Sequence, residues 1–359
     1  MSVETDIIVE RQGVAGLITL DRPRALNALT HHMIGELHAA LAEWAEDPGI
    51  QHGVLRAAGG RAFCAGGDIK AMALLGEAGR AEEARRFWRD EYTLDHYISI
   101  YPKPFVSLVD GICFGGGFGV SGHGRFRVAG ENLAFAMPEV AIGMFPDVGG
   151  THKLPRLRGW SGTWLALTGA RIGLSDAMAF GLYTHHIPAE RWPDLVDALA
   201  EGHAMEALLD RFAAAPPEPA LGALYPLIDR VFAGGSVEAI LAALDHAARG
   251  EGVDAEFALL QAATIRKVSP TSVAIAFEQM RRGISLTLAE CLVREFRVVT
   301  RILEGHDLYE GVRAMLIEKH QNPRWQPARL EDVDMGAVAA MFDTPLPDEL
   351  VLDERSPEA

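Results

Sequence analysis

Cysteine is scarce in this sequence, with three residues, Cys64, Cys113 and Cys291, in a chain of 359. Three cysteines do not make a disulfide framework, and their spacing does not match a zinc-binding pattern. A reducing compartment is therefore the simplest expectation. No histidine partner for Cys64 is evident, so a small buried packing residue is expected there rather than a nucleophile.

Positive charge is also in short supply. Lysine and arginine total 33 against 49 aspartates and glutamates, which gives a formal net charge of −16. This excess of acid argues against general binding to nucleic acid or to an acidic membrane. An anionic substrate would need a local cationic patch, and Lys319 and Arg324 could meet either phosphates or simply water.

Long hydrophobic runs are missing as well. No run approaches membrane-spanning length without a charge or a glycine, and the opening segment MSVETDIIVERQG lacks the basic and apolar regions of a secretory signal. Hydrophobic residues nevertheless make up 49% of the chain, which is ample for a core. We expect a soluble, cytoplasmic protein with no membrane partner.

The pattern of elements predicts an α/β protein. Apolar runs at 7–10 and 16–20 predict a β-hairpin, and Thr30 is placed to cap a helix that ends before Pro48. Strands and helices then alternate, which favours a layered α/β arrangement with crossovers. Later residues are mainly helical, so the expected division is an α/β core at 1–204, a helical C-terminal region at 205–343 and a polar tail at 344–359.

Glycines concentrate in the stretch 103–155. A predicted strand at 105–109 leads to Gly115, Gly116, Gly117 and Gly119, and a second glycine-bearing loop, AAGGRAFCAGGDIKAM, also meets a helix start. Glycine permits close approach of backbones, and a helix start offers unpaired N–H groups, which suits an anionic ligand or a developing oxyanion. Tight turns and close helix packing would account for the same glycines without any ligand.

Residues 117–122 also match the dinucleotide-binding pattern G-x-G-x-x-G. That fingerprint normally lies in the first βαβ unit, with an acidic residue closing a second strand. Here it lies in mid-chain and the following acid stands after a proline, so a nicotinamide or flavin site is not favoured.

Two acids lie among apolar neighbours in AMPEVAIGMFPDVGG. Glu139 and Asp147 are eight residues apart, so at least one carboxyl group is expected to be partly desolvated. Two carboxyl groups in different environments can divide acid and base roles. The alternative is that both are loop acids that cap helix starts.

Four blocks taken in order, DRPRALNAL, AFCAGGDIKAM, KPFVSLVDGICFGGG and AMPEVAIGMFPDVGGTHKLPRL, resemble the crotonase (enoyl-CoA hydratase/isomerase) superfamily. The resemblance covers roughly residues 5–333. It implies a spiral of ββα units with a helical C-terminal region. It also implies that the backbone N–H groups of Ala65 and Gly116 hold the thioester oxygen of an acyl-CoA, with substrate contacts from neighbouring residues, namely Gly66, Gly67, Asp68 and Gly115.

Within the superfamily the sequence resembles most the branch of 3-hydroxyisobutyryl-CoA hydrolases, as shown by SPTSVAIAFEQM and GHDLYEGVRAMLIEKHQNPRWQP. Hydratases place a glutamate where this chain has Gly119, and they tend to have glycine where it has Asp147. Glu91 matches an acid that lines the acyl pocket of the branch.

The resemblance implies hydrolysis of a short 3-hydroxyacyl-CoA, most simply 3-hydroxyisobutyryl-CoA in valine catabolism. Glu139 would act as general base on water or as a nucleophile that forms a mixed anhydride. Asp147 and Glu91 would bind the substrate hydroxyl, position water or tune Glu139. No metal and no cofactor are expected, apart from the coenzyme A of the substrate.

Two rival functions remain open at this point. One is an enoyl-CoA hydratase or isomerase, which would leave the thioester intact. The other is a non-catalytic acyl-CoA-binding protein, against which the intact Glu139 and Asp147 argue. The C-terminal helices could cover the acyl pocket or mediate association, so a homo-oligomer also remains open.

Overall fold

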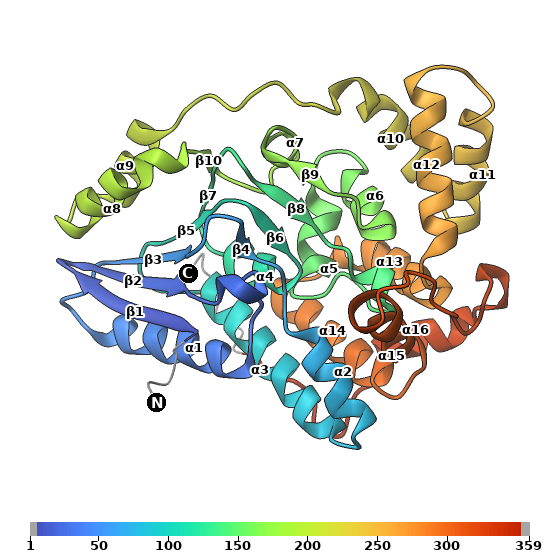
Figure 1. Cartoon of the computed structure of the whole chain (residues 1–359), viewed down its shortest axis with the longest axis horizontal. Coiled ribbons are helices and arrows are strands. Elements are labelled where there is room, and N and C mark those ends of the chain that lie inside the picture. Colours follow the sequence, from blue (N-terminus) through green and yellow to red (C-terminus); the bar gives the residue numbers. More distant parts are fainter. Residues whose placement is uncertain (1–5, 353–359) are drawn as a thin grey trace.

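The computed structural model describes residues 6–352, and its N-terminal half is built on two β-sheets (Figure 1). The larger sheet has six strands in the order β1-β2-β3-β5-β7-β10, and the smaller has four in the order β4-β6-β8-β9. The strands are β1 Ile7–Gln12, β2 Ala15–Leu20, β3 His52–Ala57, β4 Ala62–Cys64, β5 Phe105–Val109, β6 Ile112–Phe114, β7 Phe126–Ala129, β8 Ala134–Ala136, β9 Ile172–Gly173 and β10 His185–His186.

From β3 to β8, consecutive strands alternate between the two sheets. After the antiparallel hairpin β1–β2, strands β3, β5 and β7 pair in parallel in the larger sheet, while β4, β6 and β8 pair in parallel in the smaller one. Helices α2 (Ile69–Glu77) and α3 (Ala81–Ser99) follow β4, and α4 (Gly116–Gly122) follows β6. Each turn of the chain is thus a ββα unit, which confirms the predicted spiral. The smaller sheet was not predicted, since its strands have only two or three residues.

The larger sheet is buried on both faces. Leu17 of β2 packs in one apolar cluster, whereas Ile18 and Leu20 pack in the other, as the two-residue period of a strand requires. Helices α1 (His31–Glu46) and α3 contribute to the cluster with Ile18, and α8 (Trp192–Ala200) and α9 (Met205–Phe212) cover the face with Leu17. The apolar pattern of a doubly covered sheet therefore explains why β2 is buried along its whole length.

The ends of α1 show how local sequence fixes the helix. The Thr30 side chain accepts a hydrogen bond from the Met33 N–H at 3.2 Å, which confirms the predicted cap. At the other end, the Lys103 ammonium donates to the carbonyl oxygens of Trp44, Asp47 and Ile50. A cation at a helix C-terminus stabilises both the unpaired carbonyls and the helix dipole.

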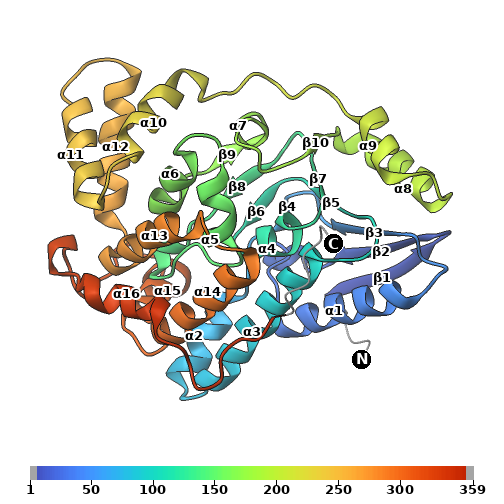
Figure 2. The ribbon, with the colours of Figure 1, turned by 180° about the vertical axis from the view of Figure 1, so that it is seen from behind.

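An extended segment, 213–220, carries the chain from α9 across the molecule to the helical region, as both views show (Figures 1 and 2). Helix α9 lies beyond the predicted boundary at residue 204, but it packs beside α8 on the larger sheet. No helix among residues 6–352 is both long and apolar enough to cross a bilayer. The remaining helices are α5 Gly150–Lys153, α6 Ser161–Thr168, α7 Leu174–Ala179, α10 Tyr225–Phe232, α11 Val237–Ala247, α12 Val253–Lys267, α13 Pro270–Gly283, α14 Leu288–Ile302, α15 Asp307–Val312 and α16 Met335–Asp343.

Part of the predicted polar tail is packed. Asp348 forms ion pairs with Arg85 and Arg89 of α3, and Leu350 is buried. Residues 353–359 of the tail lie outside the described residues. The end of the described chain therefore returns to α3, the helix that carries Glu91.

Candidate active site

The two glycine loops meet at one edge of the smaller sheet. They follow β4 and β6, which are parallel neighbours, so the ends of both strands lie together. A Cβ atom built on Gly116 would lie 3.0 Å from the Gly67 nitrogen and 2.5 Å from Glu91 Oε1. Only a glycine at 116 permits this approach of the two backbones, so the two glycine loops lie in direct contact.

Hydrogen bonding changes the pair of donors expected from the sequence. The Ala65 N–H donates to the Leu26 carbonyl oxygen at 3.0 Å, so it is not free to hold a ligand. Among residues 6–352, the N–H groups of Gly67 and Gly116 donate no hydrogen bond. The structure therefore does not support Ala65 as a donor and offers Gly67 in its place, opposite Gly116.

The turn DRPRALNAL explains why the Leu26 carbonyl oxygen occupies the Ala65 N–H. Leu26 and Asn27 adopt left-handed backbone angles, with φ of 52° and 55°. The Asn27 side chain accepts from the Arg22 N–H and donates to the carbonyls of Ala58 and Ala62. This bracing turns the Leu26 carbonyl towards Ala65, a long-range effect that the sequence of either loop does not reveal.

Glu91, Glu139 and Asp147, all predicted, lie buried around this contact. Glu91 is on α3, Glu139 opens a short 3₁₀-helix (Glu139–Ile142), and Asp147 is on the loop before α5. Their exposed fractions are 2%, 8% and 5%. Glu139 Oε1 would lie 2.5 Å from a Cβ atom on Gly115, so its carboxyl group borders the second glycine loop.

Two further buried carboxyl groups, Asp95 and Glu295, complete the cluster, and both were missed from the sequence. Asp95 follows Glu91 by four residues on α3, so both acids share the buried face of that helix. Glu295 lies on α14 among Cys291, Leu292 and Val299, on the apolar face. Helical spacing was the signal that could have found them.

The environment separates the acidities of these groups. Burial raises the pKa of Asp147 to about 6, and hydrogen bonds from the Tyr92 hydroxyl, at 2.7 Å from Oδ2, and from Trp88 oppose that rise. Burial, then the charges of Asp147 and Glu91, raise the pKa of Glu139 well above its ordinary value. Burial and Asp147 do the same for the pKa of Glu91. No lysine or arginine among residues 6–352 pairs with these acids.

Glu295 holds the loop that carries Asp147. Its two carboxylate oxygens accept from the N–H groups of Gly149 and Thr151, each at 2.8 Å. Burial raises the pKa of Glu295 to about 8, although these hydrogen bonds favour its ionised form. Gln279 of α13 donates to the Pro146 carbonyl and to the Thr151 hydroxyl, so two C-terminal helices fix this loop.

Asp95 occupies the space beside Gly119. A Cβ atom built on Gly119 would lie 2.8 and 2.9 Å from the two Asp95 carboxylate oxygens. Asp95 is fully buried, and neither oxygen has a hydrogen-bond partner. Position 119 is the one at which a hydratase is expected to carry a glutamate. Here the Asp95 carboxyl group, from α3, fills the space beside it.

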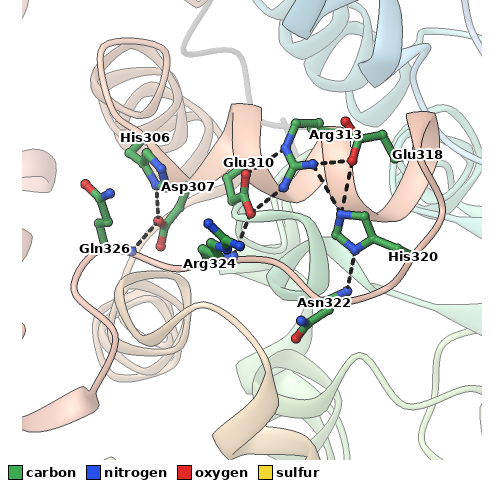
Figure 3. Close-up of polar contacts among 9 residues, drawn as sticks. All are labelled: His306, Asp307, Glu310, Arg313, Glu318, His320, Asn322, Arg324 and Gln326. Carbon is green, nitrogen blue, oxygen red and sulfur yellow. Dashed lines mark hydrogen bonds and ion pairs between the residues drawn. The ribbon is translucent and has the colours of Figure 1, made fainter.

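Other predicted residues have structural contacts. Asp68 caps α2 by accepting from the Ala71 N–H and pairs with Arg22 at 3.1 Å. Cys64 is buried and its thiol contacts Gly66, and burial raises its pKa, which agrees with a packing role. The Arg324 N–H donates to Glu310 within a polar network that ties this segment to α15 (Figure 3), while the Lys319 side chain is exposed.

Metal ligands were not expected, and residues 6–352 contain no group of three or more histidines, cysteines, aspartates or glutamates arranged to hold a metal ion. Two unpaired N–H groups and several carboxyl groups of differing acidity suit attack on a carbonyl carbon with an oxyanion held by the backbone.

Comparisons with known proteins agree with the resemblance found in the sequence. A family model described as enoyl-CoA hydratase/isomerase matches residues 15–342. The chain is 44% identical to the mitochondrial 3-hydroxyisobutyryl-CoA hydrolase of Xenopus tropicalis, over 94% of this chain and 88% of that protein. It is 40% identical to the human protein of the same name, over 93% and 88%.

Solved structures show the same fold. A carnitinyl-CoA dehydratase from Mycobacterium thermoresistibile aligns with a TM-score of 0.91 and 39% identity, covering 98% of this chain and all (100%) of that one. An enoyl-CoA hydratase from Rhodobacter sphaeroides aligns with a TM-score of 0.89 and 40% identity, covering 97% and 100%. The predicted crotonase-like architecture is confirmed.

The predicted cytoplasmic location is contradicted by the same comparisons. The curated relatives from Xenopus tropicalis, Danio rerio and human are mitochondrial proteins by name. The prediction rested on scarce cysteine and on the lack of a recognisable signal. A low cysteine content argues against an oxidising compartment but does not distinguish one reducing compartment from another.

Asp95→Asn tests whether burial of the Asp95 carboxyl group lowers the free energy of unfolding. Burial and the neighbouring acids raise its folded-state pKa above the unfolded value, so stability is lost as pH rises towards the folded pKa. The neutral amide should raise the free energy of unfolding at pH 8 by on the order of 1–3 kcal/mol, with little gain at pH 4. Chemical denaturation at both pH values measures this.

Asp90→Asn is the matched control, because Asp90 lies on the exposed side of the same helix, at 52% exposure. It should change stability by less than about 0.5 kcal/mol at either pH. An Asp95→Asn protein that is no more stable at pH 8 than at pH 4, relative to the parent, would show that the carboxyl group is compensated.

Proposed function

The chain belongs to the enoyl-CoA hydratase/isomerase family, and we propose that it hydrolyses the thioester of a short 3-hydroxyacyl-CoA, with 3-hydroxyisobutyryl-CoA as its substrate. One observation carries the proposal. The buried Glu139 borders the second glycine loop, and the charge of the buried Asp147 raises the pKa of Glu139. Position 119, in contrast, offers no side chain for the second acid of a hydratase.

The Gly67 and Gly116 N–H groups hold the thioester carbonyl oxygen. Attack on the carbonyl carbon turns that oxygen into an oxyanion, and two fixed donors stabilise the negative charge as it develops. Loss of one such donor typically lowers the rate by about 10²–10³. The backbone supplies these donors without a metal or a cofactor, and coenzyme A enters only as part of the substrate.

Glu139 supplies the reactive carboxylate. It takes a proton from the attacking water, or it attacks the carbonyl carbon itself to form a mixed anhydride that water then cleaves. In both routes the C–S bond breaks, the coenzyme A thiolate takes up a proton, and the acyl carbon leaves as a 3-hydroxy acid. A raised pKa makes Glu139 a stronger base once it is ionised.

Asp147 and Glu91 bind the 3-hydroxyl group and tune Glu139. Asp147 is the more readily ionised of the acids whose pKa is raised here, so it can accept a hydrogen bond from the substrate hydroxyl at neutral pH. Glu91 Oε1 has no partner and faces Gly116, on the side where the acyl group would lie. The product, 3-hydroxyisobutyrate, is consistent with a role in valine catabolism.

The rival function is hydration or dehydration of an acyl-CoA, because two similar solved structures are named as a dehydratase and a hydratase. That chemistry uses a second acid to exchange a proton at the carbon chain while the thioester survives. The nearest acid to position 119 is Asp95, which is fully buried and packed against the Gly119 backbone. Hydrolysis therefore fits the arrangement better.

A thioesterase assay across short hydroxyacyl-CoA and enoyl-CoA substrates tests the function. Release of free thiol from 3-hydroxyisobutyryl-CoA, with the 3-hydroxy acid identified by mass, is expected. Conversion of crotonyl-CoA with the thioester intact would support the hydratase instead. Tight binding without turnover of any substrate would indicate a non-catalytic acyl-CoA-binding protein.

Glu139→Gln keeps the shape of the side chain and removes its carboxylate. Turnover should fall by about 10²–10⁴, the usual contribution of a general base, while the circular dichroism spectrum stays unchanged. Glu43→Gln, an exposed change on α1, serves as control and should keep full activity. Near-normal kcat in Glu139→Gln would move the catalytic role to another acid.

Asp147→Asn probes the coupling of the two acids through the pH dependence of kcat/KM. The Asp147 charge raises the pKa of Glu139, so its removal should shift the acidic limb of the profile to lower pH, whatever the loss in absolute rate. Asp90→Asn should leave the limb in place, because Asp90 is exposed and pairs with His31. If the acidic limb of the Asp147→Asn profile does not shift, or shifts to higher pH, the proposed effect of the Asp147 charge on Glu139 is contradicted.

A further inference from the structure

An exposed apolar stripe runs along α12, at the outer end of the helical region. In both views α11 and α12 stand side by side at the margin of the molecule, with α11 outermost (Figures 1 and 2). Leu259 and Leu260 are 64% and 63% exposed, and Ala263, also exposed, follows one turn later. Two leucines at that exposure on one helix turn are costly to leave in water.

Charges of opposite sign bracket the stripe. Glu256 lies one turn before the leucines and Lys267 one turn after Ala263, and both side chains are exposed. At 100° per residue, all five positions fall on one face of the helix. Neither Glu256 nor Lys267 has an ion-pair partner among residues 6–352, whereas the flanking Arg266 is paired with Asp245 at 2.6 Å.

This order is complementary to itself. If a second α12 lies antiparallel about a two-fold axis midway between residues 261 and 262, Glu256 of one copy faces Lys267 of the other, twice. Leu260 then faces Ala263, whose small side chain lets the helices approach. A two-fold interface requires such matching of a surface with its own reverse.

We propose that the α12 face, defined as Glu256, Leu259, Leu260, Ala263 and Lys267, is the contact through which two copies of this chain associate. The inference does not depend on the proposed function, because none of these residues belongs to the site. One helix pair makes a small interface, so the dimer should dissociate on dilution. Sedimentation velocity of the full chain over a concentration series should show a monomer–dimer equilibrium.

Charge reversal tests the pairing. Glu256→Lys sets two lysines against each other at both ends of the interface, and Lys267→Glu sets two glutamates together, so each variant alone should weaken the dimer about tenfold or more. In a heterodimer of the two variants both facing pairs again carry opposite charges. An equimolar mixture should therefore form the heterodimer more readily than either variant forms a homodimer. The double variant E256K/K267E should dimerise like the parent.

Several outcomes would overturn the proposal. They are a parent protein that stays monomeric at every concentration, single variants that dimerise as well as the parent, and a double variant that stays monomeric. Flotation of the parent with lipid vesicles, abolished by Leu259→Asp, would instead assign the stripe to a membrane surface. The circular dichroism spectrum of the variants serves as a check on folding, and it should remain that of the parent.

Discussion

The structure depends on burying several carboxyl groups together, and no lysine or arginine among residues 6–352 forms an ion pair with them. Glu91, Asp95, Glu139, Asp147 and Glu295 are each at least nine-tenths buried, and the charge of one raises the pKa of others. Such a cluster is tolerable only if most members carry protons or accept hydrogen bonds from fixed donors. The fold gives the five carboxyl groups different numbers of hydrogen-bond donors, so their pKa values differ and they can take different chemical roles. Asp147 accepts a hydrogen bond from the Tyr92 hydroxyl, and Glu295 accepts hydrogen bonds from two backbone N–H groups. One carboxyl oxygen of Glu139 has no hydrogen-bond partner.

The helical C-terminal region contributes directly to this arrangement. Glu295 and Gln279, from α14 and α13, fix the loop on both sides of Asp147, and α15 packs against the short helix that Glu139 opens. The acids come from the spiral core, but their positions are set by residues more than a hundred positions later. A core without these helices would retain the glycine contact and lose the geometry of the reactive pair.

Local features were predictable because they depend on neighbouring residues. The β1–β2 hairpin, the Thr30 cap and the glycine turn before α4 follow from turn chemistry and periodicity, and Glu139 and Asp147 followed from their apolar surroundings and from the resemblance. Three features depended on contacts between distant segments and were missed. Strands of two or three residues carry too little pattern to predict the smaller sheet. The choice between Ala65 and Gly67 depended on the Leu26 carbonyl, and Asp95 and Glu295 lie on helices that also carry many exposed charged residues.

The meeting of Asp95 and Gly119 bears on the order in which related sequences can change. A carboxyl group can come to this point from α3 or from α4, but two cannot share it, because a side chain at 119 would collide with the Asp95 oxygens and bring a second negative charge. To change a hydrolase-like site into a hydratase-like one, Asp95 therefore has to be replaced by a smaller residue before Gly119 is replaced by an acid. The reverse order passes through an intermediate that is both overpacked and electrostatically strained. The side chains at the two positions thus constrain each other, although 24 residues separate them in the sequence.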